Sequence, residues 1–104
     1  METIPSVAKY VDALVSELPI EDIWLLEAGR APECYLEKTH NLIIITRGSA
    51  EPHKIEAEAR ALLKAKFGEA DVDAYAFPLD AIMRIPRPLL IKMALQSGEN
   101  IYCG

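Results

Sequence analysis

Three segments of the chain carry apolar residues at the spacing of an amphipathic helix. They cover residues 5–17, 52–67 and 89–96, and in each the apolar positions recur every three or four residues, which is the period of a helix with one buried face. We expect Ser49 to cap the second helix and Gly68 to end it. The polar side of the second helix, expected to face solvent, carries Glu56, Glu58, Arg60 and Lys64.

Three further segments are typical of β-strands. Residues 20–26 end in an unbroken apolar run, and residues 41–46 contain another from Leu42 to Ile45. Such runs indicate strands buried on both faces, the second of them central in a sheet. Residues 72–77 alternate in character, and residues 101–103 are compatible with a last strand at an edge. The face of the third strand that carries polar and aromatic side chains consists of Asp73, Tyr75 and Phe77.

The order of these elements predicts the fold class. Helix, strand, loop, strand, helix, strand, helix and a last strand follow one another along 104 residues. This order is typical of an α/β domain in which helices flank a small mixed sheet, and the length fits a single domain over residues 1–104. Residues 29–38 are expected to form a connecting loop or a short irregular helix, and functional side chains are often found in such segments.

Composition and charge narrow the classes of function. The chain has 16 acidic and 11 basic residues and a formal net charge of −5, so it repels the phosphate backbone of a long nucleic acid. The apolar runs are too short to cross a membrane, and the first residues lack the pattern of a secretory signal. Cys34 and Cys103 have neither zinc-site nor disulfide-framework spacing. We therefore expect a cytoplasmic protein that binds neither a membrane nor a long nucleic acid.

Short polar segments lie at the ends of the predicted strands. The segment after the first strand is Glu27, Ala28, Gly29 and Arg30. The segment at the start of the second strand is Thr39, His40 and Asn41, and the third strand carries Asp73. In this pattern and order, the chain resembles the minimal nucleotidyltransferases of the DNA polymerase β type over nearly its whole length.

The resemblance implies roles for these positions. The family's phosphate-binding loop contains a Gly-Ser pair, which Glu27 and Ala28 replace here, followed by an arginine-rich stretch that Arg30 matches. The positions that match the family's three Mg²⁺-binding carboxylates are Thr39, Asn41 and Asp73. Nucleotidyl transfer requires Mg²⁺ held by carboxylate oxygens, and only one of the three positions keeps a carboxylate. The resemblance therefore predicts a degenerate nucleotidyltransferase that is inactive.

Two functions of different classes follow from the resemblance. The first is a protein-binding module without a cofactor, because members of this family are commonly antitoxin-like partners of small helical proteins of the HEPN type; a protein partner or a homo-oligomer is then expected. The second is an active nucleotidyltransferase that uses Mg²⁺ and a nucleoside triphosphate and transfers a nucleoside monophosphate to a protein or a small molecule. Its catalytic carboxylate would be Asp73, with Glu27 or Glu37 as a replacement ligand. A weaker, third alternative is a nucleotide sensor that works without a metal.

Each of these residues also has an ordinary structural explanation. Asp73 and Glu37 can be solvated acids at a strand edge and in a loop, and Arg30 can form a surface ion pair. His40 and His53 lack a second ligand at useful spacing. The apolar residues of the last helix, Leu89, Leu90 and Met93, are expected mainly in the core, with a part left for a partner.

Overall fold

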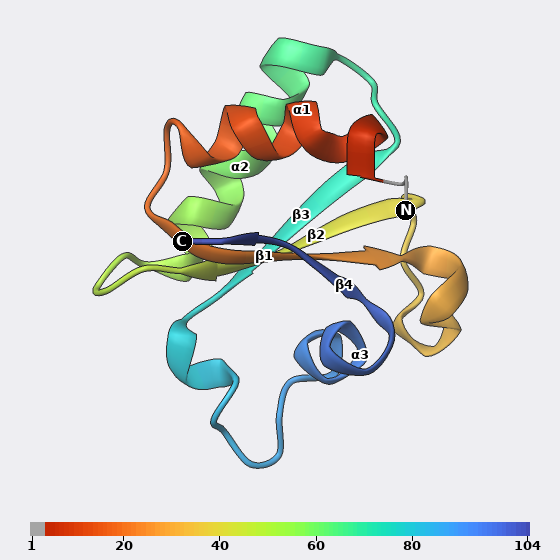
Figure 1. Cartoon of the computed structure of the whole chain (residues 1–104), viewed down its shortest axis with the longest axis vertical. Helices are drawn as coiled ribbons and strands as arrows, with labels where there is room; N and C mark the ends of the chain where they lie inside the picture. The colour runs from red at the N-terminus through yellow and green to blue at the C-terminus, as the bar shows by residue number, and fades with distance from the viewer. Residues whose placement is uncertain (1–3) are drawn as a thin grey trace.

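The structure, a computed structural model, describes residues 4–104 (Figure 1). The helices and strands are α1 (Ile4–Val15), β1 (Ile20–Glu27), β2 (His40–Thr46), α2 (Pro52–Phe67), β3 (Val72–Phe77), α3 (Leu89–Ser97) and β4 (Glu99–Cys103). Single-turn 3₁₀ helices are η1 (Ala28–Arg30), η2 (Pro32–Cys34) and η3 (Leu79–Ala81). The predicted α/β class and the predicted order of helices and strands are confirmed, including the last strand.

The four strands form one mixed sheet in the order β3-β2-β1-β4. β1 pairs antiparallel with β2 and with β4, whereas β2 pairs parallel with β3 through the crossover helix α2. β2 lies inside the sheet and all of its residues except the first are buried, as expected for a central strand. β3 and β4 are the two edges of the sheet.

The sheet separates two apolar cores. Helices α1 and α2 cover one face and α3 covers the other (Figure 1). Alternation along β3 divides its side chains between these cores: Val72, Ala74 and Ala76 face α1 and α2, while Tyr75 and Phe77 pack against the α3 side. The predicted alternation of this strand is therefore confirmed.

The bounds of α2 match the predicted residues 52–67, but its cap differs from the prediction. The residue before the helix is Glu51, whose side chain makes no capping hydrogen bond, so Ser49 is not the cap. Pro52 occupies the first turn instead, where its missing N–H costs nothing and its fixed φ suits the helix. Gly68 ends the helix as predicted, with a φ of 70° that favours glycine.

The structure also bears on membrane insertion. Among the helices that lie within residues 4–104, none combines the length and the apolar character that crossing a membrane requires.

Candidate functional site: the polar end of the sheet

Strand pairing brings the candidate residues together at one end of the sheet. Glu27 at the end of β1 pairs with His40 at the start of β2, because the two strands are antiparallel. Asn41 on β2 in turn pairs with Asp73 on the parallel strand β3. Thr39 precedes β2, so the strand begins one residue after it. We call this region the polar end of the sheet.

Asn41 has a buried amide that joins two backbone segments. Its exposed fraction is 0%, and its Nδ2 donates to the carbonyl of Leu26 at 3.2 Å and to the carbonyl of Lys38 at 2.9 Å. Its Oδ1 is buried and has no hydrogen-bond partner among the described residues. The two carbonyls fix the orientation of the amide, since a reversed amide would place oxygen against oxygen. The local backbone therefore matches an amide and would repel a carboxylate.

Thr39 is held by an acid that the sequence analysis did not single out. The Asp71 Oδ1 atom accepts a hydrogen bond from the Thr39 backbone N–H at 2.9 Å. Hydrogen bonds from the side chain and the backbone of Thr39 lower the pKa of Asp71 below its ordinary value of 3.8. In addition, the Thr39 carbonyl accepts from the N–H of Ala28 at 3.0 Å. The only sequence signal for Asp71 is its place directly before a strand.

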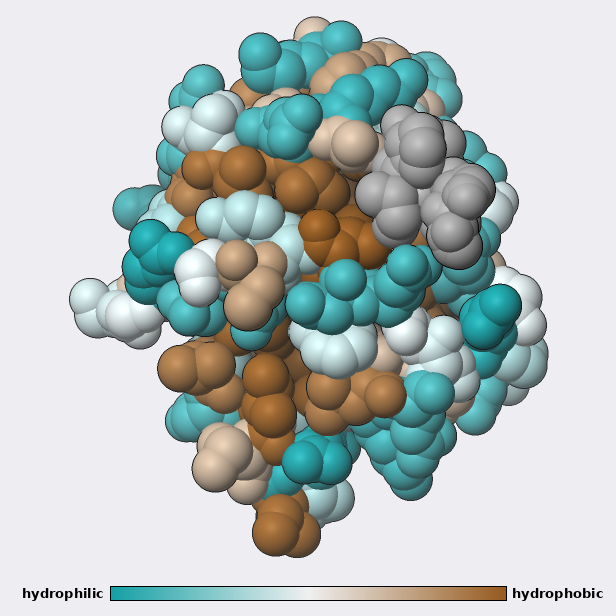
Figure 2. Space-filling model, in the orientation of Figure 1, coloured by the Kyte–Doolittle hydropathy of each residue, from teal (hydrophilic) through white to brown (hydrophobic). Residues whose placement is uncertain are grey.

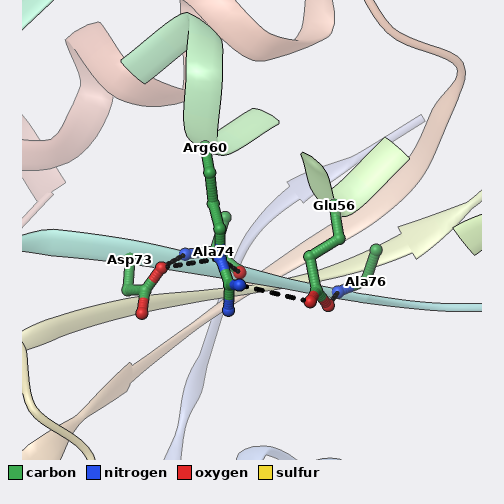
Figure 3. Close-up of polar contacts among 5 residues, drawn as sticks. All are labelled: Glu56, Arg60, Asp73, Ala74 and Ala76. Atoms are coloured by element: carbon green, nitrogen blue, oxygen red, sulfur yellow. Dashed lines mark hydrogen bonds and ion pairs between the residues drawn. The ribbon is translucent and has the colours of Figure 1, made fainter. Parts of the chain in front are cut away.

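Asp73, on β3, forms a polar network with side chains from α2 (Figure 3). Its Oδ1 accepts from Arg60 Nε at 3.0 Å and from the N–H of Ala74 at 2.8 Å. Arg60 Nε also donates to the Ala74 carbonyl at 3.0 Å, and its guanidinium lies 5.0 Å from the centre of the Tyr75 ring. Burial, and secondarily the charge of Asp73, raise the pKa of Tyr75 above its ordinary value of 10.0. Asp73 is thus engaged in an ion pair and is not a freely solvated acid.

Glu56 completes this network further along β3. Its Oε1 accepts from the N–H of Ala76 at 2.8 Å, and its Oε2 lies 3.5 Å from Arg60 Nη1 (Figure 3). Glu56 and Arg60 were expected on the solvent side of the helix, and their contacts with β3 were not predicted because the spacing of these residues does not reveal which strand edge lies beside that side. We call Glu56, Arg60 and Asp73 the edge cluster.

The edge cluster occupies the open side of β3. An edge strand presents unpaired N–H and C=O groups to which another strand can bind. Here the N–H and carbonyl of Ala74 and the N–H of Ala76 are satisfied by the side chains of the edge cluster. A strand from another chain would have to displace these side chains before it could pair with β3.

The Mg²⁺ ions implied by the resemblance do not fit these residues. The amide nitrogen of Asn41 faces two carbonyls, Asp73 bonds to a guanidinium, and Thr39 lies outside the strand. Mg²⁺ selects negatively charged oxygen ligands with octahedral geometry. Across residues 4–104, no set of three or more His, Cys, Asp or Glu side chains is grouped so as to hold a metal ion.

The positions that match the phosphate-binding loop carry one acid, Glu27, and one base, Arg30. Glu27 Oε2 lies 3.2 Å from His40 Nδ1, and Arg30 is exposed. Glu27 and Arg30 line a hollow of about 380 Å³ together with Glu99 and the C-terminal end of α3. The two carboxylates and the negative end of the α3 dipole disfavour phosphate there. Ala28, the remaining loop position, uses its N–H on the Thr39 carbonyl, and Glu37 lies exposed in the loop before β2.

A second candidate region is the exposed segment from η3 to α3. Four large apolar side chains of this segment are exposed to 47–93%, namely Leu79, Met83, Ile85 and Leu89. A hollow of about 410 Å³ lies among Arg84, Ile85, Pro86, Arg87, Lys92 and Gln96. In Figure 2, brown side chains gather at the foot of the molecule, where Figure 1 shows this segment. We call residues 79–92 the basic apolar surface.

Two arginines make polar contacts within this segment. Arg87 Nε donates to the carbonyl of Ile82 at 2.6 Å, and Arg84 Nη2 lies 3.3 Å from Asp80 Oδ1. Leu89, Leu90 and Met93 were expected mainly in the core, and Met93 is buried whereas Leu89 is 47% exposed. The signal for the exposed segment was the pair Pro86 and Pro88, which keeps residues 83–88 out of a helix.

The chain was compared with models of known protein families, with characterised proteins and with solved structures, and none of these matches it.

Proposed function

We propose that this chain is a protein-binding module, a nucleotidyltransferase-like domain that lacks the transfer chemistry, and that it binds a partner protein through the basic apolar surface. The observation that carries the proposal is the exposure of Met83 and Ile85, at 77% and 93%, beside the cations of the same segment. The partner class implied by the resemblance is a small helical protein of the HEPN type, for which this chain would be the antitoxin-like partner.

The apolar side chains of the surface offer binding energy. Full burial of a Leu, Ile or Met side chain is worth roughly 1.5–3 kcal/mol relative to exposure. Ile85 and Met83 keep most of their surface in water, so a partner that covers them gains most of this amount at each position. A few well-packed side chains near the centre of an interface commonly carry most of its affinity.

The charges of the surface select an acidic partner. Arg84, Arg87 and Lys92 lie around the hollow, and Asp80 is the acid that pairs with Arg84. The segment is therefore basic within a chain whose formal net charge is −5. Opposite charges at a contact surface accelerate association and exclude wrong partners. A partner segment with acidic and apolar side chains, such as one face of an amphipathic helix, matches this surface.

The polar end of the sheet supports binding over nucleotidyl transfer. Asn41 and Asp73 are both engaged with backbone groups of this chain, and Asp73 also pairs with Arg60. If these residues became metal ligands, those bonds would break. The backbone groups left buried without a hydrogen-bond partner would then cost free energy of folding. Their present bonds stabilise the fold.

The proposal can be tested with a displayed library of random peptides, about 12 residues long, which is enough to span a groove-binding helix. We expect the immobilised chain to enrich acidic and apolar peptides. The variant Ile85→Asp should weaken their affinity at least about tenfold, measured by fluorescence anisotropy, because a hot-spot side chain is lost. The matched control is Tyr35→Asp, since Tyr35 is 89% exposed and lies outside the surface.

Two results would contradict the proposal. One is that acidic peptides bind equally well to the Ile85→Asp variant, or that both substitutions weaken them equally. The other is that vesicles of anionic lipid bind the chain through Ile85 while no peptide does, because the surface would then contact a membrane. Both substitutions change exposed side chains and are expected to leave the fold unchanged.

A further inference from the structure

A groove runs between α1 and the edge strand β4. It has a volume of about 180 Å³ and is lined by Val7, Ala8, Val11, Asp12, Ile101 and Tyr102. In Figure 1, α1 lies above β4, and in Figure 2 brown side chains gather along the lower side of α1. The groove shares no residue with the basic apolar surface.

A bulge in β4 turns two apolar side chains toward this groove. The register between β1 and β4 shifts between Ile23, opposite Tyr102, and Trp24, opposite Asn100. Ile101 is the extra residue of the bulge, so Ile101 and Tyr102 both pack against the core on the α1 side. Both remain only half-buried, and the groove beside them has room for one more apolar side chain.

The backbone of β4 beyond the bulge is open for pairing. Gly104 N donates to the carbonyl of Glu21 at 2.7 Å, and Cys103 lies opposite Asp22. In an antiparallel ladder, hydrogen-bonded and non-hydrogen-bonded pairs alternate, so the N–H and C=O of Cys103 point away from β1. Asn100 bonds to the carbonyls of Ile23 and Tyr102. Among the side-chain hydrogen bonds of residues 4–104, none involves the backbone of Cys103.

The charges around the open edge are acidic. Asp12 lines the groove, Glu99 is exposed at the start of β4, and Asp22 lies opposite Cys103. Arg47, a cation that lies beside Gly104, pairs with Glu21 at 3.3 Å. A second copy of this chain would bring two acidic edges together, whereas Lys and Arg side chains complement them.

We propose that the open edge of β4 and the groove beside it accept an extended protein segment that carries apolar and basic side chains. The segment adds a strand to the sheet through the N–H and C=O of Cys103. An apolar side chain on one face of the segment enters the groove against Ala8 and Ile101, and neighbouring Lys or Arg side chains reach Asp12 and Glu99. Strand addition of this kind combines main-chain bonds with pockets for alternate side chains.

The test compares two substitutions at one backbone position. Cys103→Pro removes the outward N–H, and the edge tolerates proline because that N–H is not used in the ladder. Cys103→Ser keeps the N–H and removes only the thiol. The same library of random peptides is displayed to the wild-type chain and to both variants. Circular dichroism and thermal unfolding establish that each variant is folded.

We expect basic and apolar peptides to be enriched by the wild-type chain and by Cys103→Ser, and to bind Cys103→Pro at least about tenfold more weakly. Asp12 is an exposed helix position, and the variant Asp12→Lys should shift the enriched peptides away from basic sequences. This variant tests the proposal even if Cys103→Pro does not fold. Three results would overturn the proposal: no enrichment of basic peptides, equal binding to Cys103→Pro, or a wild-type chain that dimerises through β4. Loss of acidic peptides in the Ile85→Asp variant tests only the basic apolar surface, whereas loss of basic peptides in Cys103→Pro tests only the β4 edge. The two proposals can therefore fail independently.

Discussion

The two edges of the sheet differ in whether their outward backbone groups have hydrogen-bond partners. At the β3 edge, side chains from α2 bind the outward N–H and C=O groups of Ala74 and the N–H of Ala76. At the β4 edge, the outward groups of Cys103 face solvent beside an apolar groove. Natural proteins usually block edges that must not pair. The β3 edge is blocked in this way, whereas the β4 edge keeps its capacity to pair.

This comparison changes the interpretation of Asp73. Its place in the sequence resembles that of a metal-binding carboxylate, yet in the structure it bonds to Arg60 and to the N–H of Ala74. Asp73 therefore helps to close the β3 edge. The same type of residue at the same strand position can serve catalysis or structure, and its hydrogen-bond partners distinguish the two.

The largest effect is expected from Asn41→Asp. The new carboxylate would face the carbonyls of Leu26 and Lys38, which accept hydrogen bonds and offer none. We expect a loss of about 3 kcal/mol in the free energy of unfolding, because a buried polar group loses its partners. Denaturant unfolding at neutral pH measures this loss.

The matched control is Asn100→Asp on the edge strand β4. The Asn100 amide also donates to two carbonyls, but the residue is exposed, so water can solvate the carboxylate and the loss should stay below about 1.5 kcal/mol. Equal losses in the two variants would show that the polar end of the sheet tolerates a carboxylate, as a metal site would require.

A smaller effect is expected from Arg60→Ala. It removes the ion pair with Asp73, the bond to the Ala74 carbonyl and the contact with the Tyr75 ring. The unfolding free energy should fall by about 1.5 kcal/mol, since the pair is partly exposed. The β3 edge would also lose part of its cover, so sedimentation velocity should detect more self-association in this variant than in the wild-type chain.

The control for this change is Arg84→Ala. Its pair with Asp80 is exposed and spans only four residues, so its loss should cost under about 0.5 kcal/mol and leave the association state unchanged. The comparison of the two edges fails if Arg60→Ala behaves like Arg84→Ala in both measurements.

The smallest effect concerns pH. Hydrogen bonds from Thr39 lower the pKa of Asp71 in the folded state, so the folded chain holds this proton less tightly than the unfolded chain does. The contribution to stability is complete above the ordinary value of 3.8 and is lost as the pH falls through the lower folded value. Asp71→Asn should therefore flatten the acid limb of stability against pH, measured by urea unfolding. An unchanged slope would contradict this role of Asp71.

Much of the fold could be predicted from the sequence because its signals are local. Unbroken apolar runs indicated β1 and β2, alternation indicated β3, and helical spacing indicated α1 and α2. The start of α2 at Pro52 was predicted correctly, but its cap was mispredicted at Ser49, because several polar residues precede the helix and only the backbone shows which one is its cap.

The functional regions depend on contacts that local patterns do not contain. The resemblance assigned Asn41 and Asp73 to one metal site, and strand register places the two residues side by side. The role of Arg60 could not be predicted, because it depends on how α2 crosses the edge of β3. The open edge of β4 likewise depends on the bulge at Ile101, which no turn or glycine signal marks.

The most direct test of the central claim, that the polar end of the sheet is structural, is calorimetric titration of the chain with ATP in the presence and absence of Mg²⁺. We predict no heat beyond dilution in either condition, because Asn41 and Asp73 are committed to bonds within the chain. A saturable heat that requires Mg²⁺ and disappears in Asp73→Asn would contradict the claim and show a working metal–nucleotide site.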